Sequence, residues 1–161
     1  MPSARSRHLF VLAFILAMLA LSASVYLEKV ALLHPCSLCI VQRGCVALIA
    51  VLNALAWGFR PKVNGTRAYA ALALLLSTLG AASAIRQLWL QAHPLPHPTA
   101  STNLFHLDQS EALLETLKVF ALGSPDCAIV NWTLLDLSLP EWSLLTLAGL
   151  GLITCLQLFE R

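Results

Sequence analysis

The sequence predicts an all-α membrane protein, a four-helix transmembrane bundle with a short amphipathic helix in its second outer loop. Of the 161 residues, 58% are apolar and only 11% are charged, whereas about a quarter of the residues in an average soluble domain are charged. Four apolar runs approach or exceed the roughly 18 to 20 residues that a helix needs to cross a bilayer. We therefore expect a single integral membrane domain over residues 1–161, embedded in the lipid bilayer. The net charge of +2 is too small to indicate nucleic acid as a partner.

The expected membrane helices cover residues 9–27, 36–57, 68–90 and 142–159. We expect the first to be retained, because a cleaved signal has an apolar core of only about 7 to 15 residues. The connections are residues 28–35, 58–67 and 91–141. In the last of these, residues 111–122 carry apolar side chains at helical spacing and indicate the amphipathic helix, which would lie on the bilayer or dock a partner.

The distribution of lysine and arginine predicts the orientation. The N-terminus, the 58–67 connection and the C-terminus carry six of these residues: Arg5, Arg7, Arg60, Lys62, Arg67 and Arg161. The opposite side has Lys29 and Lys118. Cytoplasmic segments are enriched in these residues, so we expect both termini in the cytoplasm and the long connection outside.

A Cys-x-x-Cys motif opens the second apolar run. Cys36 and Cys39 are followed by Arg43, and positions three and four apart share one face of a helix. Pro35 suits the first turn of that helix, where its missing N–H is not needed. The helix N-terminus and the Arg43 charge both favour a thiolate. The pattern indicates a dithiol poised for redox chemistry at the membrane surface.

The other cysteines divide by their place along the chain. Cys45 and Cys155 lie inside apolar runs and are expected to be packing thiols. Cys36, Cys39 and Cys127 face the outer compartment, and an odd number of thiols there suggests a relay or intermolecular pairing.

Two other uses of the motif are less well supported. A disulfide across one helical turn closes too short a loop to stabilise the fold much, and such a bond is usually redox-active. A zinc site would need a second clustered pair of ligands, and the Arg43 charge would oppose a cation. We therefore expect no metal.

On these residues the chain resembles the disulfide bond formation protein B (DsbB) family, quinone reductases of the bacterial inner membrane. The shared features are the four helices, the Cys-x-x-Cys motif opening the second helix, and the arginine that follows it. The long outer loop then ends in Ser-Pro-Asp-Cys-Ala, before Leu-Ser-Leu-Pro-Glu-Trp leads into the last helix.

The resemblance implies a protein-disulfide oxidoreductase of a Gram-negative inner membrane, with its active site in the periplasm. It would reoxidise a DsbA-like thioredoxin-fold oxidase and pass the electrons to a membrane quinone, ubiquinone or menaquinone. Cys36 and Cys39 would reduce the quinone, with Cys39 nearest its ring and Arg43 polarising it. Cys127 would exchange disulfides with the oxidase and link transiently to Cys36. Arg86 is a further candidate for the quinone pocket, unless it extends to the lipid headgroups.

Three residues that follow Arg86 in the sequence have no single expected role. Gln87 is a second candidate for the quinone pocket, and Gln91 and His93 lie near the same level.

The chain departs from the family at one position of the long loop. The family has a second loop cysteine, which is expected here at Ala100 or Ser101. Without that thiol the loop cannot form its own disulfide, and the usual acceptor for electrons from DsbA is missing. An engineered substitution that traps a Cys36–Cys127 intermediate and a natural variant with altered activity both fit. The competing function is a non-catalytic membrane protein that binds a thiol partner or quinone.

Overall fold

The computed structural model describes residues 4–30, 36–59, 63–93, 125–128, 133–134 and 137–159. Their elements are α1 (Ala4–Val30), α2 (Ser37–Phe59), α3 (Val63–Ala92), the 3-10 turn η2 (Pro125–Ala128), β1 (Thr133–Leu134), β2 (Leu137–Ser138) and α5 (Leu139–Phe159). The predicted amphipathic helix over 111–122 and the positions Ala100 and Ser101 lie outside the described residues.

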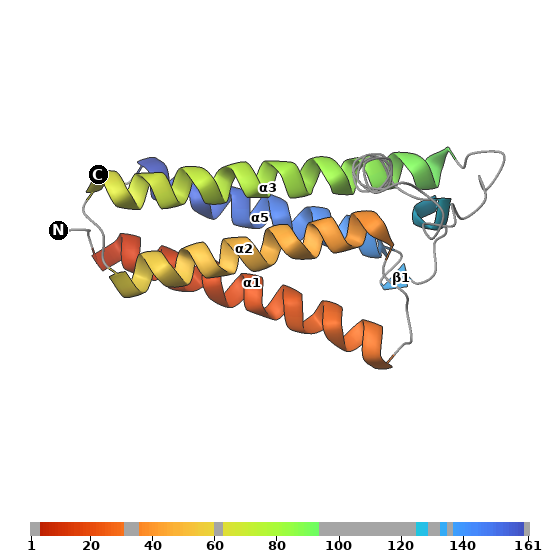
Figure 1. Ribbon diagram of the computed structural model, residues 1–161, viewed down its shortest axis with the longest axis horizontal. Coiled ribbons are helices and arrows are strands. Elements are labelled where there is room, and N and C mark those ends of the chain that lie inside the picture. Colours follow the sequence, from red (N-terminus) through yellow and green to blue (C-terminus); the bar gives the residue numbers. More distant parts are fainter. Residues whose placement is uncertain are drawn as a thin grey trace, which may run out of the picture.

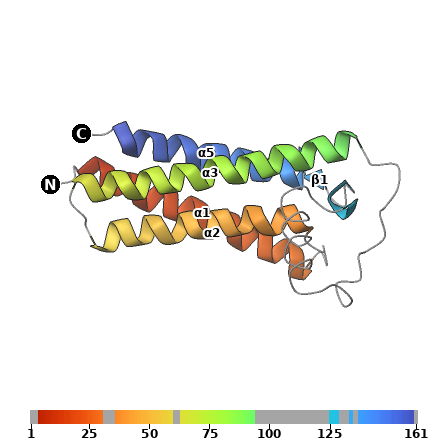
Figure 2. The same ribbon diagram turned by 45° about the horizontal axis from the view of Figure 1, so that its top comes forward.

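The four long helices form an antiparallel bundle in which each packs mainly against two others (Figure 1). Helix α3 contacts α2 and α5, and α1 contacts the same two helices from the other side. The start of α1 and the end of α5 lie at one end of the bundle, and η2 lies at the opposite end (Figures 1 and 2). We call this second end, which carries Cys36 and Cys127, the cysteine end.

All four helices are long and apolar enough to cross a membrane. Large apolar side chains cover much of the outer surface, including Leu19, Phe59, Leu79 and Leu152. In water such a surface would be unfavourable, whereas the bilayer interior accepts it. The predicted fold class, a four-helix membrane bundle, is confirmed.

Small residues let the helices approach closely in the interior. A Cβ atom built on Gly80 of α3 would lie 2.8 Å from the Leu147 side chain of α5 and 3.3 Å from the Cβ of Cys45. Nearby, the Ser77 hydroxyl donates to the Leu147 carbonyl at 2.6 Å. Small residues and hydroxyl groups are typical of helix contacts in membranes, where packing replaces the hydrophobic effect.

Hydrogen bonds at the N-termini of α2 and α5 fix where these two helices begin at the cysteine end. Cys36 caps α2, because its carbonyl accepts the first helical hydrogen bond from the Ile40 N–H at 3.1 Å. At the start of α5, the Glu141 carboxylate accepts from both the backbone N–H and the hydroxyl of Ser138, at 2.5 and 2.8 Å. This capping-box arrangement begins α5 at Leu139, before the expected start at residue 142. The hairpin of β1 and β2, with Leu134 opposite Leu137, leads directly into it.

Candidate functional site

The two cysteines of the motif lie in direct contact at the N-terminus of α2. Cys36 is the capping residue and Cys39 lies within the first helical turn. The Cys36 thiol donates to the Cys39 sulfur at a distance of 3.1 Å. A disulfide bond is about 2.05 Å long, so a small closing movement would join the two atoms. Both residues are half-buried free thiols.

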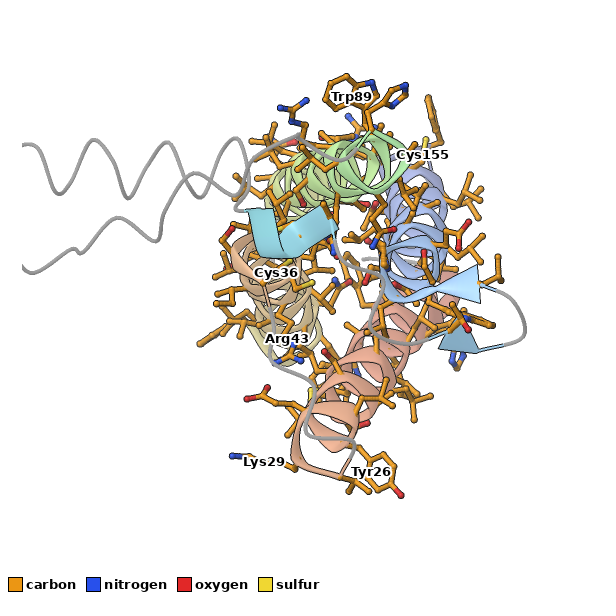
Figure 3. All side chains as sticks on the ribbon, turned by 90° about the vertical axis from the view of Figure 1, so that its right-hand side faces the viewer. Tyr26, Lys29, Cys36, Arg43, Trp89 and Cys155 are labelled. Carbon is orange, nitrogen blue, oxygen red and sulfur yellow. The ribbon has the colours of Figure 1, made fainter. Side chains whose placement is uncertain are left out.

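The turn η2 brings the third thiol to the same place. Cys127 is 1% exposed and packs with Leu38 of α2 and Leu90 of α3, and Cys36 packs against this cluster. Its sulfur also lies 3.7 Å from the Ser37 hydroxyl. Viewed from the cysteine end, the turn lies over the ends of α2 and α3, close to Cys36 (Figure 3). Residues separated by most of the sequence thus form one three-thiol cluster: Cys36, Cys39 and Cys127.

Within this cluster Cys36 holds its proton more tightly than an ordinary thiol. Hydrogen bonding to Cys127, then hydrogen bonding to Cys39 and burial, raise the pKa of the Cys36 thiol. Each of these interactions favours the neutral thiol over the thiolate. A thiol that keeps its proton is a hydrogen-bond donor and a poor nucleophile. The arrangement therefore leaves Cys39 as the sulfur that receives hydrogen bonds.

Two buried glutamines complete the surroundings of Cys39. The Gln87 amide of α3 approaches the Cys39 sulfur with its nitrogen at 3.4 Å and its oxygen at 3.6 Å. The same Gln87 oxygen accepts from the Gln42 amide nitrogen at 3.0 Å. Gln87 is 4% exposed and Gln42 is 3% exposed, so these hydrogen bonds are made away from solvent.

Arg43 lies on α2 but its described contacts are with α1. Its Nε donates to the Ser24 hydroxyl at 2.5 Å, one Nη donates to the Ser24 carbonyl at 3.1 Å, and the other pairs with the Glu28 carboxylate. Figure 3 shows Arg43 on the side of α2 that faces α1. Spacing alone had placed Arg43 in a stripe with the two cysteines. The arginine side chain is long enough to turn toward an acidic partner on another helix. Spacing within α2 does not indicate that direction.

Arg86 lies on α3 beside an aromatic pair. Its guanidinium carbon is 4.7 Å from the centre of the Trp89 ring, and Trp89 stacks on His93 with ring centres 5.1 Å apart. Trp89 is about half exposed and lies on the side of α3 away from Cys36 (Figure 3). This cation–π contact occupies one face of the Trp89 ring. The role of Arg86 in a quinone pocket stays a prediction, as do the roles of Gln91 and His93.

The two remaining cysteines lie apart from the cluster. Cys45 is buried near Gly80, and Cys155 is half-buried near the end of α5. Among the described residues, no group of three or more His, Cys, Asp or Glu side chains is arranged to hold a metal ion.

Sequence reasoning named the three thiols but missed the polar partners around them. Gln42 was not singled out, Gln87 was not connected with Cys39, and neither Ser24 nor Glu28 was connected with Arg43. A signal was present, because polar residues inside apolar runs are costly in a membrane and usually have a partner or a function. The spacing within one helix could not show which residue of another helix meets them.

These features define a class: a helical membrane protein with a thiol cluster at one end of a four-helix bundle. The family model for the disulfide bond formation protein DsbB matches residues 6–157, so the chain belongs to the DsbB family. It is 40% identical to disulfide bond formation protein B of Stutzerimonas stutzeri, over 100% of this chain and 99% of that protein. It is 39% identical to disulfide bond formation protein B 1 of Pseudomonas aeruginosa PAO1 over the same shares, and 34% identical to the Azoarcus sp. protein over 96% and 93%. No solved structure matches this chain.

Proposed function

We propose that the protein is a quinone-linked thiol oxidase that acts in a Gram-negative inner membrane. It would take two electrons and two protons from the dithiol of a DsbA-like thioredoxin-fold oxidase and pass them to ubiquinone or menaquinone. The overall reaction converts a dithiol and a quinone into a disulfide and a quinol, so electrons and protons balance. Family membership supports the thiol–disulfide chemistry. The observation that carries the proposal is the contact of Cys36 with both Cys39 and Cys127.

The three thiols suffice for a relay in which Cys36 is the shared sulfur. When Cys36 and Cys39 form a disulfide, the Cys127 thiolate attacks Cys36. The Cys36–Cys127 bond forms, the Cys36–Cys39 bond breaks and Cys39 leaves as a thiolate. A partner thiolate then attacks Cys127 and releases Cys36, and the second partner thiol resolves the mixed disulfide. Three reduced thiols remain. This route needs no second loop cysteine at Ala100 or Ser101.

Arg43, four residues after Cys39 on α2, has hydrogen-bond donors that suit a quinone. Three of the guanidinium N–H groups of Arg43 bind α1, and arginine has five donors, so others can bind a carbonyl oxygen. A bound quinone supplies the acceptor for the two electrons and two protons released when Cys36 and Cys39 return to the disulfide. Arg43 would hold it by hydrogen bonding and favour negative charge on its oxygen. Its polar head would lie near the cysteine end, which we place on the periplasmic side.

The binding-only alternative has one observation in its favour. Cys127 is 1% exposed, so a partner thiolate reaches it only after η2 moves away from α2 and α3. A protein that never makes this movement would bind quinone or a thiol partner without turnover.

The test is quinone reduction by the purified protein, with a reduced DsbA-type oxidase as donor and ubiquinone as acceptor. We expect turnover in the unaltered protein and its loss in Cys39→Ser, because the Cys36–Cys39 dithiol that reduces the quinone in the proposed relay is then gone. Cys155→Ser is the matched control and should retain turnover, because Cys155 lies near the far end of α5.

Two results would count against the proposal. Binding of both quinone and oxidase without turnover would support the binding-only alternative. Turnover that appears only after Ala100→Cys or Ser101→Cys would show that the three-thiol route fails and that the missing loop cysteine is required.

A further inference from the structure

In the part of the chain that the structure describes, the Gln87 amide is a buried polar group from another helix that contacts Cys39. It lies on α3, and its nitrogen and oxygen are 3.4 and 3.6 Å from the Cys39 sulfur of α2. An amide can donate through its nitrogen and accept through its oxygen. The same side chain can therefore accept a hydrogen bond from a Cys39 thiol and donate one to a Cys39 thiolate.

Gln42 determines which of these roles dominates. Its nitrogen donates to the Gln87 oxygen at 3.0 Å, and this contact assigns oxygen and nitrogen within the Gln87 amide. With the oxygen directed to Gln42, the nitrogen is the group left for the sulfur. Both glutamines are almost fully buried, so water does not compete for these hydrogen bonds. The Gln42–Gln87 pair presents an N–H donor to Cys39.

The neighbouring thiol adds a second donor. The Cys36 S–H donates to Cys39 at 3.1 Å. Cys39 then receives hydrogen bonds from Cys36 and from Gln87, and hydrogen bonds to a charged group stabilise that charged form. The charged group nearest in sequence, Arg43, makes its described contacts with Ser24 and Glu28 of α1. The closest described donors to Cys39 are thus uncharged.

We propose that Gln87 stabilises the Cys39 thiolate as a further functional residue of the redox site, and that Gln42 is a positioning residue that orients the Gln87 amide. The inference rests on the proposed function, in which Cys39 is the sulfur that leaves as a thiolate and passes electrons onward. It gives a reason why electrons would leave from Cys39 rather than from Cys36.

The test measures the reactivity of Cys39 without quinone or partner. The reduced protein is treated with iodoacetamide over a range of pH, and the modification of each cysteine is followed by mass spectrometry. Because only the thiolate reacts, Gln87→Met should move the Cys39 rate profile to higher pH by about one pH unit and lower the rate at neutral pH about tenfold. Gln42→Met should move the profile in the same direction by a smaller amount, because the donor remains but is less well oriented.

Gln157→Met is the matched control. Gln157 is a buried glutamine on α5 that contacts Asn53 near the opposite end of the bundle, so this variant should leave the Cys39 profile unchanged. An unchanged profile in Gln87→Met, or an equal shift in Gln157→Met, would overturn the inference. If the shift occurs while the unaltered protein shows no quinone turnover, Gln87 retains its effect on Cys39 and the proposed function fails.

Discussion

Among single residues, Cys36 is the one that contacts both other thiols of the cluster. It donates to Cys39 and packs against Cys127. Hydrogen bonding to Cys127 is the largest of the effects that raise its pKa, ahead of hydrogen bonding to Cys39 and burial. The raised pKa keeps Cys36 protonated at pH values where an ordinary thiol begins to ionise. In the proposed relay Cys36 is attacked, and a sulfur with that role does not need to be a thiolate.

Removal of the Cys127 thiol should therefore make Cys36 more reactive. In the reduced, unaltered protein we expect Cys36 to be alkylated more slowly than Cys39 at pH 8, because less of it is thiolate. In Cys127→Ala the largest cause of the raised pKa is gone, so the Cys36 rate at pH 8 should increase severalfold. Residue-resolved mass spectrometry after iodoacetamide treatment measures both rates. Cys155→Ala serves as the control, and a Cys36 rate that is equal or lower in Cys127→Ala would contradict this account.

Among the helices, the contact between α1 and α2 at the cysteine end depends on Arg43. Helix α1 diverges from the other helices toward its C-terminal end (Figure 1). Arg43 reaches across to Ser24 and Glu28, both in the last part of α1. Charged groups within membrane helices are costly unless they are paired. The ion pair thus fixes α1 beside the residues that carry the thiols.

This contact predicts coupling between Glu28 and Arg43 in stability. Glu28→Ala and Arg43→Ala should each lower the free energy of unfolding in mixed detergent micelles, because each removes the ion pair that links α1 to α2. The double variant should lose less than the sum of the two, with a coupling energy of about 0.5 to 3 kcal/mol. Lys29→Ala is a control from the same end of α1, near Glu28 but absent from the Arg43 contacts. Strictly additive effects of the two substitutions would show that the pair does not join α1 to α2.

The helices were largely predictable from sequence, because membrane length and apolar composition impose them. The contacts between the helices were less predictable. The start of α5 at Leu139 depends on the hydrogen bonds between Ser138 and Glu141. The spacing of this serine and glutamate is a capping signal in the sequence, whereas the expected start at residue 142 followed the apolar run alone. The turn of Arg43 toward α1 follows from helix packing. Neither the period of α2 nor its composition indicates which neighbour offers a carboxylate.

For the whole molecule, the bundle separates a cysteine end from an end that carries the start of α1 and the end of α5 (Figure 1). The three thiols predicted from sequence meet at the first of these ends. That Cys127 belongs with Cys36 and Cys39 was implied by family resemblance, and the structure adds its contacts with Leu38 and Leu90. The approach of Gln87 to Cys39 was not predictable, because it depends on the relative rotation of α2 and α3. A residue separation of 48 along the chain contains no information on that rotation.

The most direct test of the three-thiol cluster is disulfide mapping of the Cys39→Ser variant. Purified protein is reduced, treated with the mild thiol oxidant diamide, alkylated and digested without a reducing agent. We predict an intramolecular Cys36–Cys127 disulfide in most molecules, because Cys36 has lost its other partner and Cys127 packs against it. Cys45 and Cys155 should be recovered as alkylated thiols from the same digest. If Cys36 and Cys127 are both recovered as separate alkylated thiols, or are linked only between molecules, they do not form the relay proposed here.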